Sequence, residues 1–469
     1  MSHVIHPAAL REYDVRGTVG QTLDAEDARA IGRSFATRVR HAGGTRVAVG
    51  RDGRLTSPML EAALVDGLTA GGIDVVRIGI GPTPMLYFAE QVLEVDGAVQ
   101  VTGSHNPPGD NGFKLVLGHR SFFGDDIRDL ARLAAAGDWS EGQDGGRGDG
   151  AGSVTDADLL DRYVGRLMAG YAGGSYRIGW DCGNGAAGPA ILALTAQLPG
   201  EHHVIFAEID GNFPNHHPDP TIPANLRDLQ ALVREKSLDF GVAFDGDGDR
   251  IGVVDGQGTI VWGDRLLAIL AGPVLAAHPG AAIVGDVKAS RTLFDRIAAL
   301  GGKPVMARSG HSLMKEAMHA HDAPLAGEMS GHIFFGGAHG GYDDAPFAAV
   351  QLIRALHLSG GSLAALCGKM PTLVSTPEIR LPVEDARKFN VVDEVLARLE
   401  DEGADVNRLD GARVTTEDGW WLLRASNTEG ALTLRAEATD RAGLGRLLDT
   451  IAGHLARSGI SFSGAEIPR

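Results

Sequence analysis

Cysteines and long apolar runs are scarce in this sequence. Among its 469 residues only Cys182 and Cys367 are cysteines, too few for a disulfide framework, so we expect a reducing compartment, the cytoplasm. The longest apolar stretch, residues 266–277, is broken by Gly272 and Pro273 and is too short to span a bilayer. The N-terminal segment lacks the apolar core of a secretory signal. These absences exclude a small disulfide-stabilised scaffold and predict no membrane partner.

Positive charge is also in deficit. The chain has 43 Lys and Arg against 60 Asp and Glu, a net charge of -17 at pH 7. Such a balance argues against general nucleic-acid binding, because the phosphate backbone would be repelled. An anionic substrate would therefore need a local cluster of cationic side chains.

Glycine, in contrast, is abundant, and the chain is too long for one ordinary core. The 66 glycines often adjoin Asp, Ser, His or Asn, which indicates functional loops. Apolar strands followed by a Gly/Asp loop and a helix start recur at residues 46–58, 176–189 and 282–294. A second recurring unit, a polar loop between short apolar runs, follows each of them. This internal repeat predicts three related α/β domains with mostly parallel strands.

The C-terminal part has a different pattern. From about residue 371 we expect strands that pair antiparallel, an amphipathic helix over residues 384–400 and a closing helix over residues 441–458. The predicted architecture is three α/β domains of mixed sheets with flanking helices plus a smaller α+β domain, around a central cleft. The expected boundaries are residues 1–152, 153–258, 259–370 and 371–469.

The loop at residues 102–107 (TGSHNP) places Ser104 just after a predicted strand. His105 and Asn106 offer hydrogen-bond donors, and Lys114 adds a positive charge. A serine needs such activation to act as a nucleophile. Ser, Asn and Pro also favour ordinary turns, so these residues alone leave both interpretations open.

The loop at residues 245–250 (DGDGDR) carries the most specific signal. Asp245, Asp247 and Asp249 cannot all be neutralised by Arg250, and oxygen ligands at this density suit Mg²⁺ or Ca²⁺. An EF-hand is excluded because its sixth position would be Arg250 and its twelfth Gly256. Three protein oxygens would leave coordination positions on Mg²⁺ for a phosphate oxygen. A solvated acidic turn is the less favoured alternative.

Three further loops are ambiguous when taken singly. Residues 183–188 (GNGAAG) match a dinucleotide fingerprint, but Asp181 just before them would repel a pyrophosphate, so we interpret them as a tight turn. Residues 328–332 (EMSGH) offer a carboxylate, a hydroxyl and an imidazole that could bind sugar hydroxyls. Residues 424–428 (RASNT) combine a guanidinium, hydroxyls and an amide that suit a phosphate monoester.

These four motifs, 102–107, 245–250, 328–332 and 424–428, occur in that order at wide spacing, and the set resembles the α-D-phosphohexomutase family. The resemblance covers the whole chain, with one motif per domain, and is greatest to the bacterial phosphomannomutase/phosphoglucomutase branch. One departure is Gly430, where family members often have proline.

The resemblance implies a role for each matched residue. Ser104 would carry a phosphoryl group and, with Asp245, Asp247 and Asp249, bind Mg²⁺. The implied catalytic residues are Ser104, Arg16, His105, Lys114, Arg250, His311 and His332. The implied substrate-binding residues are Tyr13, Lys288, Glu328, Ser330, Asp343, Arg424, Ser426, Asn427 and Thr428.

The implied activity is interconversion of hexose 1-phosphate and hexose 6-phosphate, of mannose and/or glucose, in the cytoplasm. The expected cofactors are Mg²⁺ and glucose 1,6-bisphosphate, and the expected partner is a sugar phosphate, with the chain a monomer or weak homo-oligomer. The phosphoglucosamine mutase branch, a metal-dependent phosphatase and a nucleotide-binding or regulatory protein remain alternatives.

Overall fold

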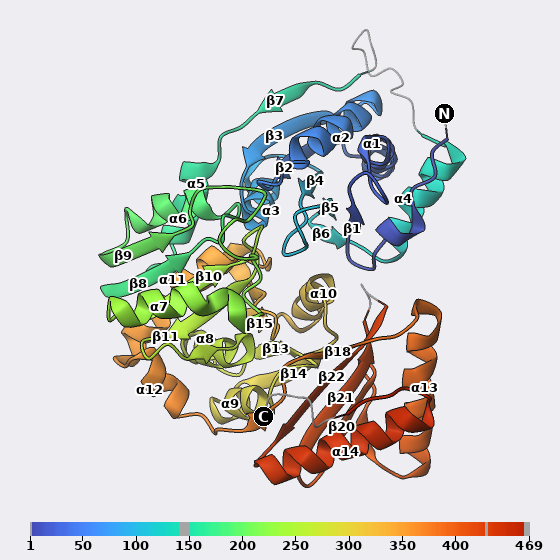
Figure 1. Cartoon of the computed structure of the whole chain (residues 1–469). Helices are drawn as coiled ribbons and strands as arrows, with labels where there is room; N and C mark the ends of the chain where they lie inside the picture. The colour runs from blue at the N-terminus through green and yellow to red at the C-terminus, as the bar shows by residue number, and fades with distance from the viewer. Residues whose placement is uncertain (1, 140–150, 427–429, 464–469) are drawn as a thin grey trace.

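The computed structural model describes residues 2–139, 151–426 and 430–463. These residues form four β-sheets, each from a successive part of the chain. In Figure 1 the N-terminal unit lies at the top, the second at the left, the third below it and the C-terminal unit at the lower right. The chain follows an arc, so the first and last units both face the right-hand side of this view.

The first unit contains a mixed sheet. Its strands are β1 (Val15–Thr18), β2 (Arg46–Arg51), β3 (Asp74–Ile80), β4 (Gly97–Val101), β5 (Asp110–Leu117), β6 (Arg120–Phe122) and β7 (Val154–Asp156). Its helices are η1 (Pro7–Ala9), α1 (Ala25–His41), α2 (Ser57–Ala70), α3 (Thr83–Val92) and α4 (Asp125–Ala136). The strand order is β1-β5-β4-β2-β3-β7, with β6 beside β5. Helices α1 and α2 pack closely at Gly32, where a Cβ would lie 2.3 Å from the Leu64 carbonyl oxygen.

The second unit has a smaller mixed sheet. Its elements are α5 (Leu160–Met168), β8 (Tyr176–Asp181), α6 (Gly188–Thr195), β9 (Gly200–Ile205), η2 (Pro223–Leu226), α7 (Arg227–Glu235), β10 (Phe240–Phe244), β11 (Ile251–Asp255) and β12 (Ile260–Val261). The strand order is β12-β11-β10-β8-β9. Strand β10 is buried along its whole length, as is typical of a central parallel strand covered on both faces.

The third unit repeats this plan. Its elements are α8 (Gly263–Ala277), β13 (Ala282–Asp286), α9 (Arg291–Ala299), β14 (Lys303–Ala307), α10 (His311–His321), β15 (Leu325–Gly327), β16 (Ile333–Phe335), η3 (Gly337–His339), α11 (Ala345–Ser359) and α12 (Leu363–Gly368). The strand order is β14-β13-β15-β16. The side chain of Asp344 caps α11 by accepting a hydrogen bond from the Phe347 amide.

The fourth unit is a wholly antiparallel sheet with two helices. Its elements are β17 (Val374–Ser375), β18 (Ile379–Pro382), α13 (Asp385–Asp401), β19 (Asp405–Asn407), β20 (Ala412–Thr415), β21 (Gly419–Ala425), β22 (Ala431–Ala438) and α14 (Arg441–Arg457). The strand order is β17-β22-β21-β20-β19, with β18 also beside β22. The predicted change to an α+β unit and both predicted helices are confirmed, with ends one residue from those expected.

The first three sheets share one core topology. Three parallel strands and one antiparallel strand lie in the orders β5-β4-β2-β3, β11-β10-β8-β9 and β16-β15-β13-β14. The internal repeat predicted from the sequence is therefore confirmed. The three predicted polar loops occupy equivalent places, between β4 and β5, between β10 and β11, and between β15 and β16. Chain topology alone brings these loops to corresponding edges of their sheets.

The units are joined by shared apolar cores. One cluster runs through the first three units and includes Phe88, Tyr163 and Phe347, while Val287, Trp420 and Leu422 join the third unit to the fourth. Strands β7 and β12 extend the first two sheets a few residues past the expected boundaries at 152 and 258. The domain boundaries themselves remain a prediction. No helix in the described ranges is both long and apolar enough to cross a membrane.

Candidate active site

The loop that follows β4 holds Ser104 in a backbone conformation unusual for serine, with φ of 47°. Its side chain is buried, at 2% exposure. The hydroxyl donates a hydrogen bond to Asp245 Oδ2 over 2.7 Å and lies 3.1 Å from His105 Nδ1. A left-handed non-glycine residue costs roughly 1–2 kcal/mol, so surrounding contacts must impose it. The predicted serine and the predicted acidic loop are thus in direct contact across two sheets.

Arg54 supplies much of this constraint. It is almost fully buried, and its Nη2 atom donates to the carbonyl oxygens of Ser104 and Asn106 over 2.7 and 2.6 Å. Its Nη1 atom donates to two more carbonyl oxygens of the same loop. On the other side, Asp52 accepts hydrogen bonds from the Thr102 hydroxyl and the Gly103 amide. Arg54 and Asp52 therefore fix the backbone of the serine loop through hydrogen bonds.

The loop between β10 and β11 brings three carboxylates together in the interior. Asp245, Asp247 and Asp249 are fully buried, and one oxygen from each lies within 4.8 Å of the others. Within the described residues, Asp247 Oδ1 has no hydrogen-bond partner, and Asp249 Oδ1 has only the His332 imidazole, at 3.3 Å. Buried carboxylate oxygens without partners are costly unless a cation binds them. The donor set fits a hard divalent ion such as Mg²⁺.

Lys114, on β5, lies against the same carboxylates. Its Nζ atom is 2.7 Å from Asp247 Oδ2 and also contacts Asp249. Burial opposes its charge, but the two carboxylates raise the pKa of Lys114 well above its ordinary value. Burial and repulsion from Asp247 and Asp249 raise the pKa of Asp245 well above its ordinary range. A cationic side chain therefore already compensates part of this negative cluster.

Two arginines flank the serine and the acidic loop. Arg16, on β1, donates to the carbonyl oxygen of Gly103 and pairs with Asp14. The backbone amide of Arg250 donates to Asp245 Oδ1 over 3.2 Å, and its Nε lies 3.3 Å from His332 Nε2. Arg16 therefore contacts the serine loop, and Arg250 contacts the acidic loop.

The loop between β15 and β16 adds a carboxylate and an imidazole. His332 Nδ1 lies 3.0 Å from Glu328 Oε2, and its Nε2 lies 3.3 Å from Asp249 Oδ1. Burial lowers the affinity of this imidazole for protons, but Asp249 and Glu328 raise its pKa to about 9. The Ser330 hydroxyl lies 3.2 Å from His332 Nδ1. Glu328, Ser330 and His332 thus join the acidic loop of the second sheet.

His311 and Asp343 complete this part of the site. His311 begins α10, and its ring centroid lies 5.9 Å from that of His332 and 6.0 Å from that of Tyr13. Burial and the nearby Lys315 and Lys114 cations lower the pKa of His311 well below its ordinary value. Asp343 is fully buried and pairs with Lys315 over 2.7 Å.

The fourth sheet contributes Arg424, near the end of β21. Its Nε donates to Asp410 Oδ2 over 3.0 Å. Ser426 follows on the same segment and is buried, at 9% exposure, whereas Asn427 and Thr428 lie outside the described residues. Lys288, at the end of β13, pairs with Glu378 of the fourth unit over 3.0 Å. The predicted cations of the third and fourth units therefore meet at the junction of these units.

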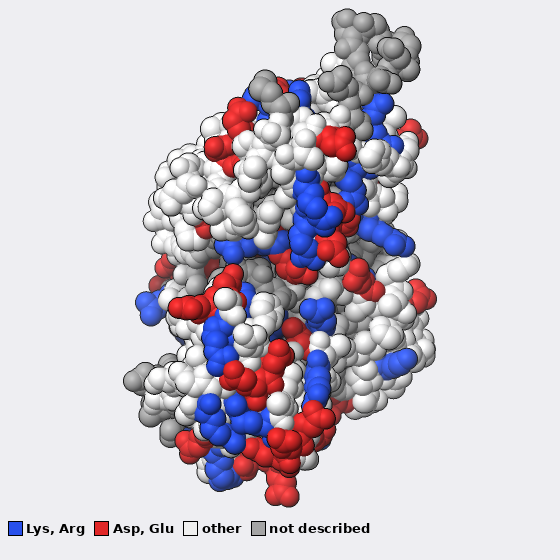
Figure 2. Space-filling view, turned by 90° about the vertical axis from the view of Figure 1, so that its right-hand side faces the viewer, with Lys and Arg blue, Asp and Glu red and all other residues white. Residues whose placement is uncertain are grey.

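A series of short contacts links the predicted residues of all four sheets. It runs from Ser104 through the acidic loop to His332 and Glu328, and then through the loop that precedes α10 to Arg424. Figure 2 shows the right-hand side of the molecule in Figure 1, where Lys and Arg border a hollow between the upper and lower halves. Asp and Glu border the same hollow, so charges of both signs meet there.

Sequence reasoning missed several buried residues that hold this site in place. They are Asp52, Arg54, Thr83, Asp286 and Asp410, and the half-buried Lys315 belongs with them. The only available signal was position, since Asp52 and Asp286 end or follow equivalent strands of the repeat, β2 and β13. Their partners lie far away in the sequence, so composition and spacing could not identify them.

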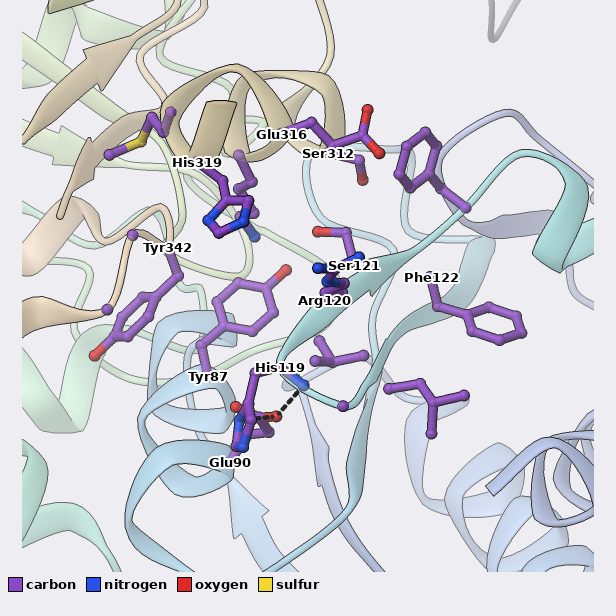
Figure 3. A pocket seen from close by; sticks show the side chains of 18 of the residues that line it. Tyr87, Glu90, His119, Arg120, Ser121, Phe122, Ser312, Glu316, His319 and Tyr342 are labelled. Atoms are coloured by element: carbon purple, nitrogen blue, oxygen red, sulfur yellow. Dashed lines mark hydrogen bonds and ion pairs between the residues drawn. The ribbon is translucent and has the colours of Figure 1, made fainter. Parts of the chain in front are cut away.

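A large cavity of about 1160 Å³ lies beside this site, between the first and third units. Figure 3 shows Ser312, Glu316 and His319 of α10 facing the turn that carries His119 and Arg120, with Tyr87 between them and Tyr342 to the left. Ser104, Asp245 and Arg424 do not line it. Lys315 does, and its ammonium lies 3.9 Å from the centre of the Tyr87 ring. The cavity is therefore a neighbour of the predicted site and is not the site itself.

Family models cover nearly the whole chain. Phosphoglucomutase/phosphomannomutase alpha/beta/alpha domains I, II and III match residues 8–138, 162–258 and 262–373, and the C-terminal domain model of the same family matches residues 378–454. The fold and these matches together define an enzyme of the mutase class, which is an isomerase.

Individual relatives agree with the family models. A phosphomannomutase/phosphoglucomutase of Pseudomonas putida is 43% identical, over 97% of this chain and 98% of its own length. A phosphoglucomutase of Neisseria gonorrhoeae is 41% identical, over 93% and 94%. A phosphoglucomutase/phosphomannomutase family protein of Burkholderia thailandensis has a crystal structure with TM-score 0.89 and 41% identity, covering 98% of this chain and 99% of its own. The chain belongs to the phosphoglucomutase/phosphomannomutase family, and the resemblance inferred from the four motifs is confirmed.

Proposed function

We propose that this enzyme interconverts hexose 1-phosphate and hexose 6-phosphate, of mannose and/or glucose, through a phosphorylated Ser104. The observation that carries the proposal is the 2.7 Å hydrogen bond from the Ser104 hydroxyl to Asp245 within the cationic and acidic cluster. A buried serine in a forced left-handed conformation is typical of a functional position. The names of the relatives support the sugar class.

The proposed reaction has two phosphoryl transfers. In the first, the P–O bond at Ser104 breaks and a bond forms to the free 1- or 6-hydroxyl of the substrate, which gives a 1,6-bisphosphorylated sugar. After this intermediate turns around, its other phosphoryl group returns to Ser104. Lys114, Arg16 and Arg250 lie where they can stabilise negative charge on the moving group.

The acidic loop is the proposed Mg²⁺ site. Asp245, Asp247 and Asp249 would hold the ion together with the phosphate on Ser104, and the unpartnered Oδ1 atom of Asp247 supports this assignment. When bound, the ion would neutralise charge on the phosphoryl oxygens. Lys114 contributes a second positive charge beside Asp247 and Asp249 and favours the ionised form of these two carboxylates.

Most of the proposed substrate-binding residues lie in the third and fourth units. Glu328 and Ser330 would bind sugar hydroxyls, with Tyr13, Lys288 and Asp343 nearby. Arg424, Ser426, Asn427 and Thr428 would hold whichever phosphate is not reacting. A guanidinium is suited to this because it can donate two parallel hydrogen bonds to a phosphate.

His311 is the proposed proton acceptor for the attacking hydroxyl. The lowered pKa of His311 keeps its imidazole neutral at pH 7, so that it can take a proton. Its buried Nδ1 has no hydrogen-bond partner among the described residues. His332, held by Glu328 and Asp249, and His105, beside Ser104, would orient the reacting groups.

The remaining expectations are part of the same proposal. Glucose 1,6-bisphosphate would serve as intermediate and activator, and two free cysteines favour a cytoplasmic location. We further propose that the enzyme acts as a monomer or weak homo-oligomer.

A direct assay tests the function. The purified protein, incubated with Mg²⁺, glucose 1,6-bisphosphate and either mannose 1-phosphate or glucose 1-phosphate, should form the corresponding 6-phosphate. Glucosamine 1-phosphate should react far more slowly. Preferred turnover of glucosamine phosphate would assign the enzyme to that branch, and release of inorganic phosphate without isomerised sugar would indicate a phosphatase.

A further inference from the structure

Asp410 connects the fourth sheet to a loop of the third unit. It lies between β19 and β20, and its Oδ2 atom accepts hydrogen bonds from Arg424 Nε over 3.0 Å and from the Ser309 backbone amide over 3.1 Å. Its exposure is 9%. One carboxylate oxygen therefore joins the proposed phosphate-binding guanidinium to the segment between β14 and α10.

The next amide of that segment holds a second carboxylate. The Gly310 amide donates to Glu328 Oε1 over 2.8 Å, and Glu328 is the proposed ligand of the sugar hydroxyls. Two successive backbone amides thus connect to the proposed phosphate ligand Arg424, through Asp410, and to the proposed sugar ligand Glu328. The two amides lie in neighbouring peptide planes joined at the Ser309 Cα, so the position of Arg424 relative to Glu328 depends on these two hydrogen bonds and on the backbone conformation of Ser309.

The segment itself is fixed from two further directions. The Ser309 hydroxyl donates to Asp286 Oδ2 over 2.8 Å, and the Tyr13 hydroxyl donates to the Ser309 carbonyl oxygen over 2.9 Å. Gly310 has φ of 133°, and a Cβ there would lie 2.4 Å from Tyr13 Cζ. A side chain at position 310 would clash with Tyr13. Glycine avoids this clash, and the segment can keep the conformation in which the two amides face their carboxylates.

We propose that Asp410 is a positioning residue that sets the orientation of Arg424 and its distance from Glu328. The site would then select substrates by the separation between a phosphate monoester and the hydroxyls of a hexose ring. This inference rests on the proposed function. The hydrogen bond to Asp410 occupies Nε and restrains the plane of the guanidinium group. It thereby restrains the direction of the two terminal amino groups, which a phosphate would contact.

Electrostatics alone predicts the opposite effect. A carboxylate beside a phosphate dianion repels it, so a simple charge argument expects Asp410→Asn to bind substrate more tightly. Positioning expects weaker binding, because an amide oxygen holds the guanidinium less firmly and the amide nitrogen cannot accept from either donor. The sign of the change in KM therefore distinguishes the two accounts.

The experiment compares Asp410→Asn with Asp418→Asn, which breaks an exposed ion pair of the same unit with Arg446. Asp410→Asn should raise KM for both hexose 1-phosphate and hexose 6-phosphate by about tenfold, with kcat changed much less. Asp418→Asn should leave both constants unchanged. In an Arg424→Ala background the effect of Asp410→Asn should disappear, since Asp410 acts through Arg424.

Several results would overturn the proposal. They are an unchanged or lower KM in Asp410→Asn, or an effect that persists in full in the Arg424→Ala background. Asp410→Ala, compared by Tm and KM, provides a second variant if the amide disturbs folding. A loss of Tm with unchanged KM would mean a structural role only. Absence of mutase turnover in the unmutated protein would instead count against the proposed function.

Discussion

Ser104 combines three properties that an ordinary turn serine does not need. It is buried, its φ is positive, and its hydroxyl meets a carboxylate from another sheet. Turn chemistry alone explains the sequence Ser-His-Asn-Pro, but it does not explain burial against Asp245. The contact with the acidic loop therefore supports the proposal that Ser104 is a functional serine, although the role itself stays a prediction.

Replacing Ser104 by alanine should lower kcat by roughly 10³-fold or more, because the group that accepts and donates the phosphoryl is removed. The Tm should change little, since Arg54 holds the loop through backbone carbonyl oxygens. Steady-state kinetics and thermal melting measure these effects. Ser121→Ala, in the same unit but outside the site, is the matched control. Turnover of Ser104→Ala near that of the control would refute the phosphoserine mechanism.

His311 gives a prediction for the pH dependence of stability. Burial and nearby cations hold its pKa in the folded state below the ordinary value of 6.5 that it regains on unfolding. The unfolded state therefore binds more protons as the pH falls below about 6.5, and folding stability decreases there. Between pH 7.5 and 5.5 the Tm of the native protein should fall more than that of His311→Gln. Parallel Tm curves would show that this imidazole is not held neutral.

At the scale of elements, much of the site could be predicted because the fold is repeated. The loops 102–107, 245–250 and 328–332 all connect a parallel strand to the antiparallel strand that follows it. A polar loop between two apolar strands is visible in a sequence, and three at equivalent places predict convergence at one site. The fold class was recoverable on this basis, whereas the family was recognised from the resemblance of all four motifs, the fourth of which lies outside the repeat.

The supporting residues could not be predicted in the same way. Arg54 acts on carbonyl oxygens about fifty residues away, and Asp410 accepts from an amide of another unit. Backbone acceptors carry no sequence signature, because every residue has one. Short strands such as β17 and β19 are hard to predict for a related reason, since two or three residues show no clear alternation.

The acidic loop gives a prediction about metal. Three buried carboxylates repel each other, and Mg²⁺ should relieve this repulsion. Because the ion binds the folded state and not the unfolded state, the Tm of the protein should rise with Mg²⁺ concentration. Chelation with EDTA should abolish turnover, and added Mg²⁺ should restore it. Asp245→Asn should reduce the Mg²⁺-dependent shift, whereas Asp418→Asn should keep it. A Tm independent of Mg²⁺, with full turnover after exhaustive chelation, would contradict the assignment.

At the scale of the whole molecule, the four units contribute different parts of one site. The first carries Ser104 and the second the acidic loop, the third carries the proposed sugar-binding residues, and the fourth carries the proposed phosphate-binding Arg424. Such a division suits a reaction in which the intermediate reverses its orientation, since the remote phosphate must be held in both half-reactions. The arrangement predicts that Arg424 serves both directions equally.

Arg424→Ala should therefore lower kcat/KM for hexose 1-phosphate and hexose 6-phosphate alike. Losing a charge-assisted contact costs roughly 1.5–3 kcal/mol, or about tenfold or more in kcat/KM. The bisphosphate should also escape more often, so added glucose 1,6-bisphosphate should partly restore turnover. Kinetics in both directions, with Arg446→Ala as the control, measure this. A loss confined to one direction would mean that Arg424 reads the orientation of the sugar.

The central claim is that a phosphoryl group passes through Ser104. The most direct measurement is the intact mass of the protein after incubation with glucose 1,6-bisphosphate, followed by peptide mapping. We expect one added phosphate, located on Ser104 and absent from Ser104→Ala, and we expect hexose 6-phosphate to remove it with formation of the bisphosphate. A protein that turns over substrate while Ser104 never carries phosphate, or whose phosphate lies on another residue, would contradict the account.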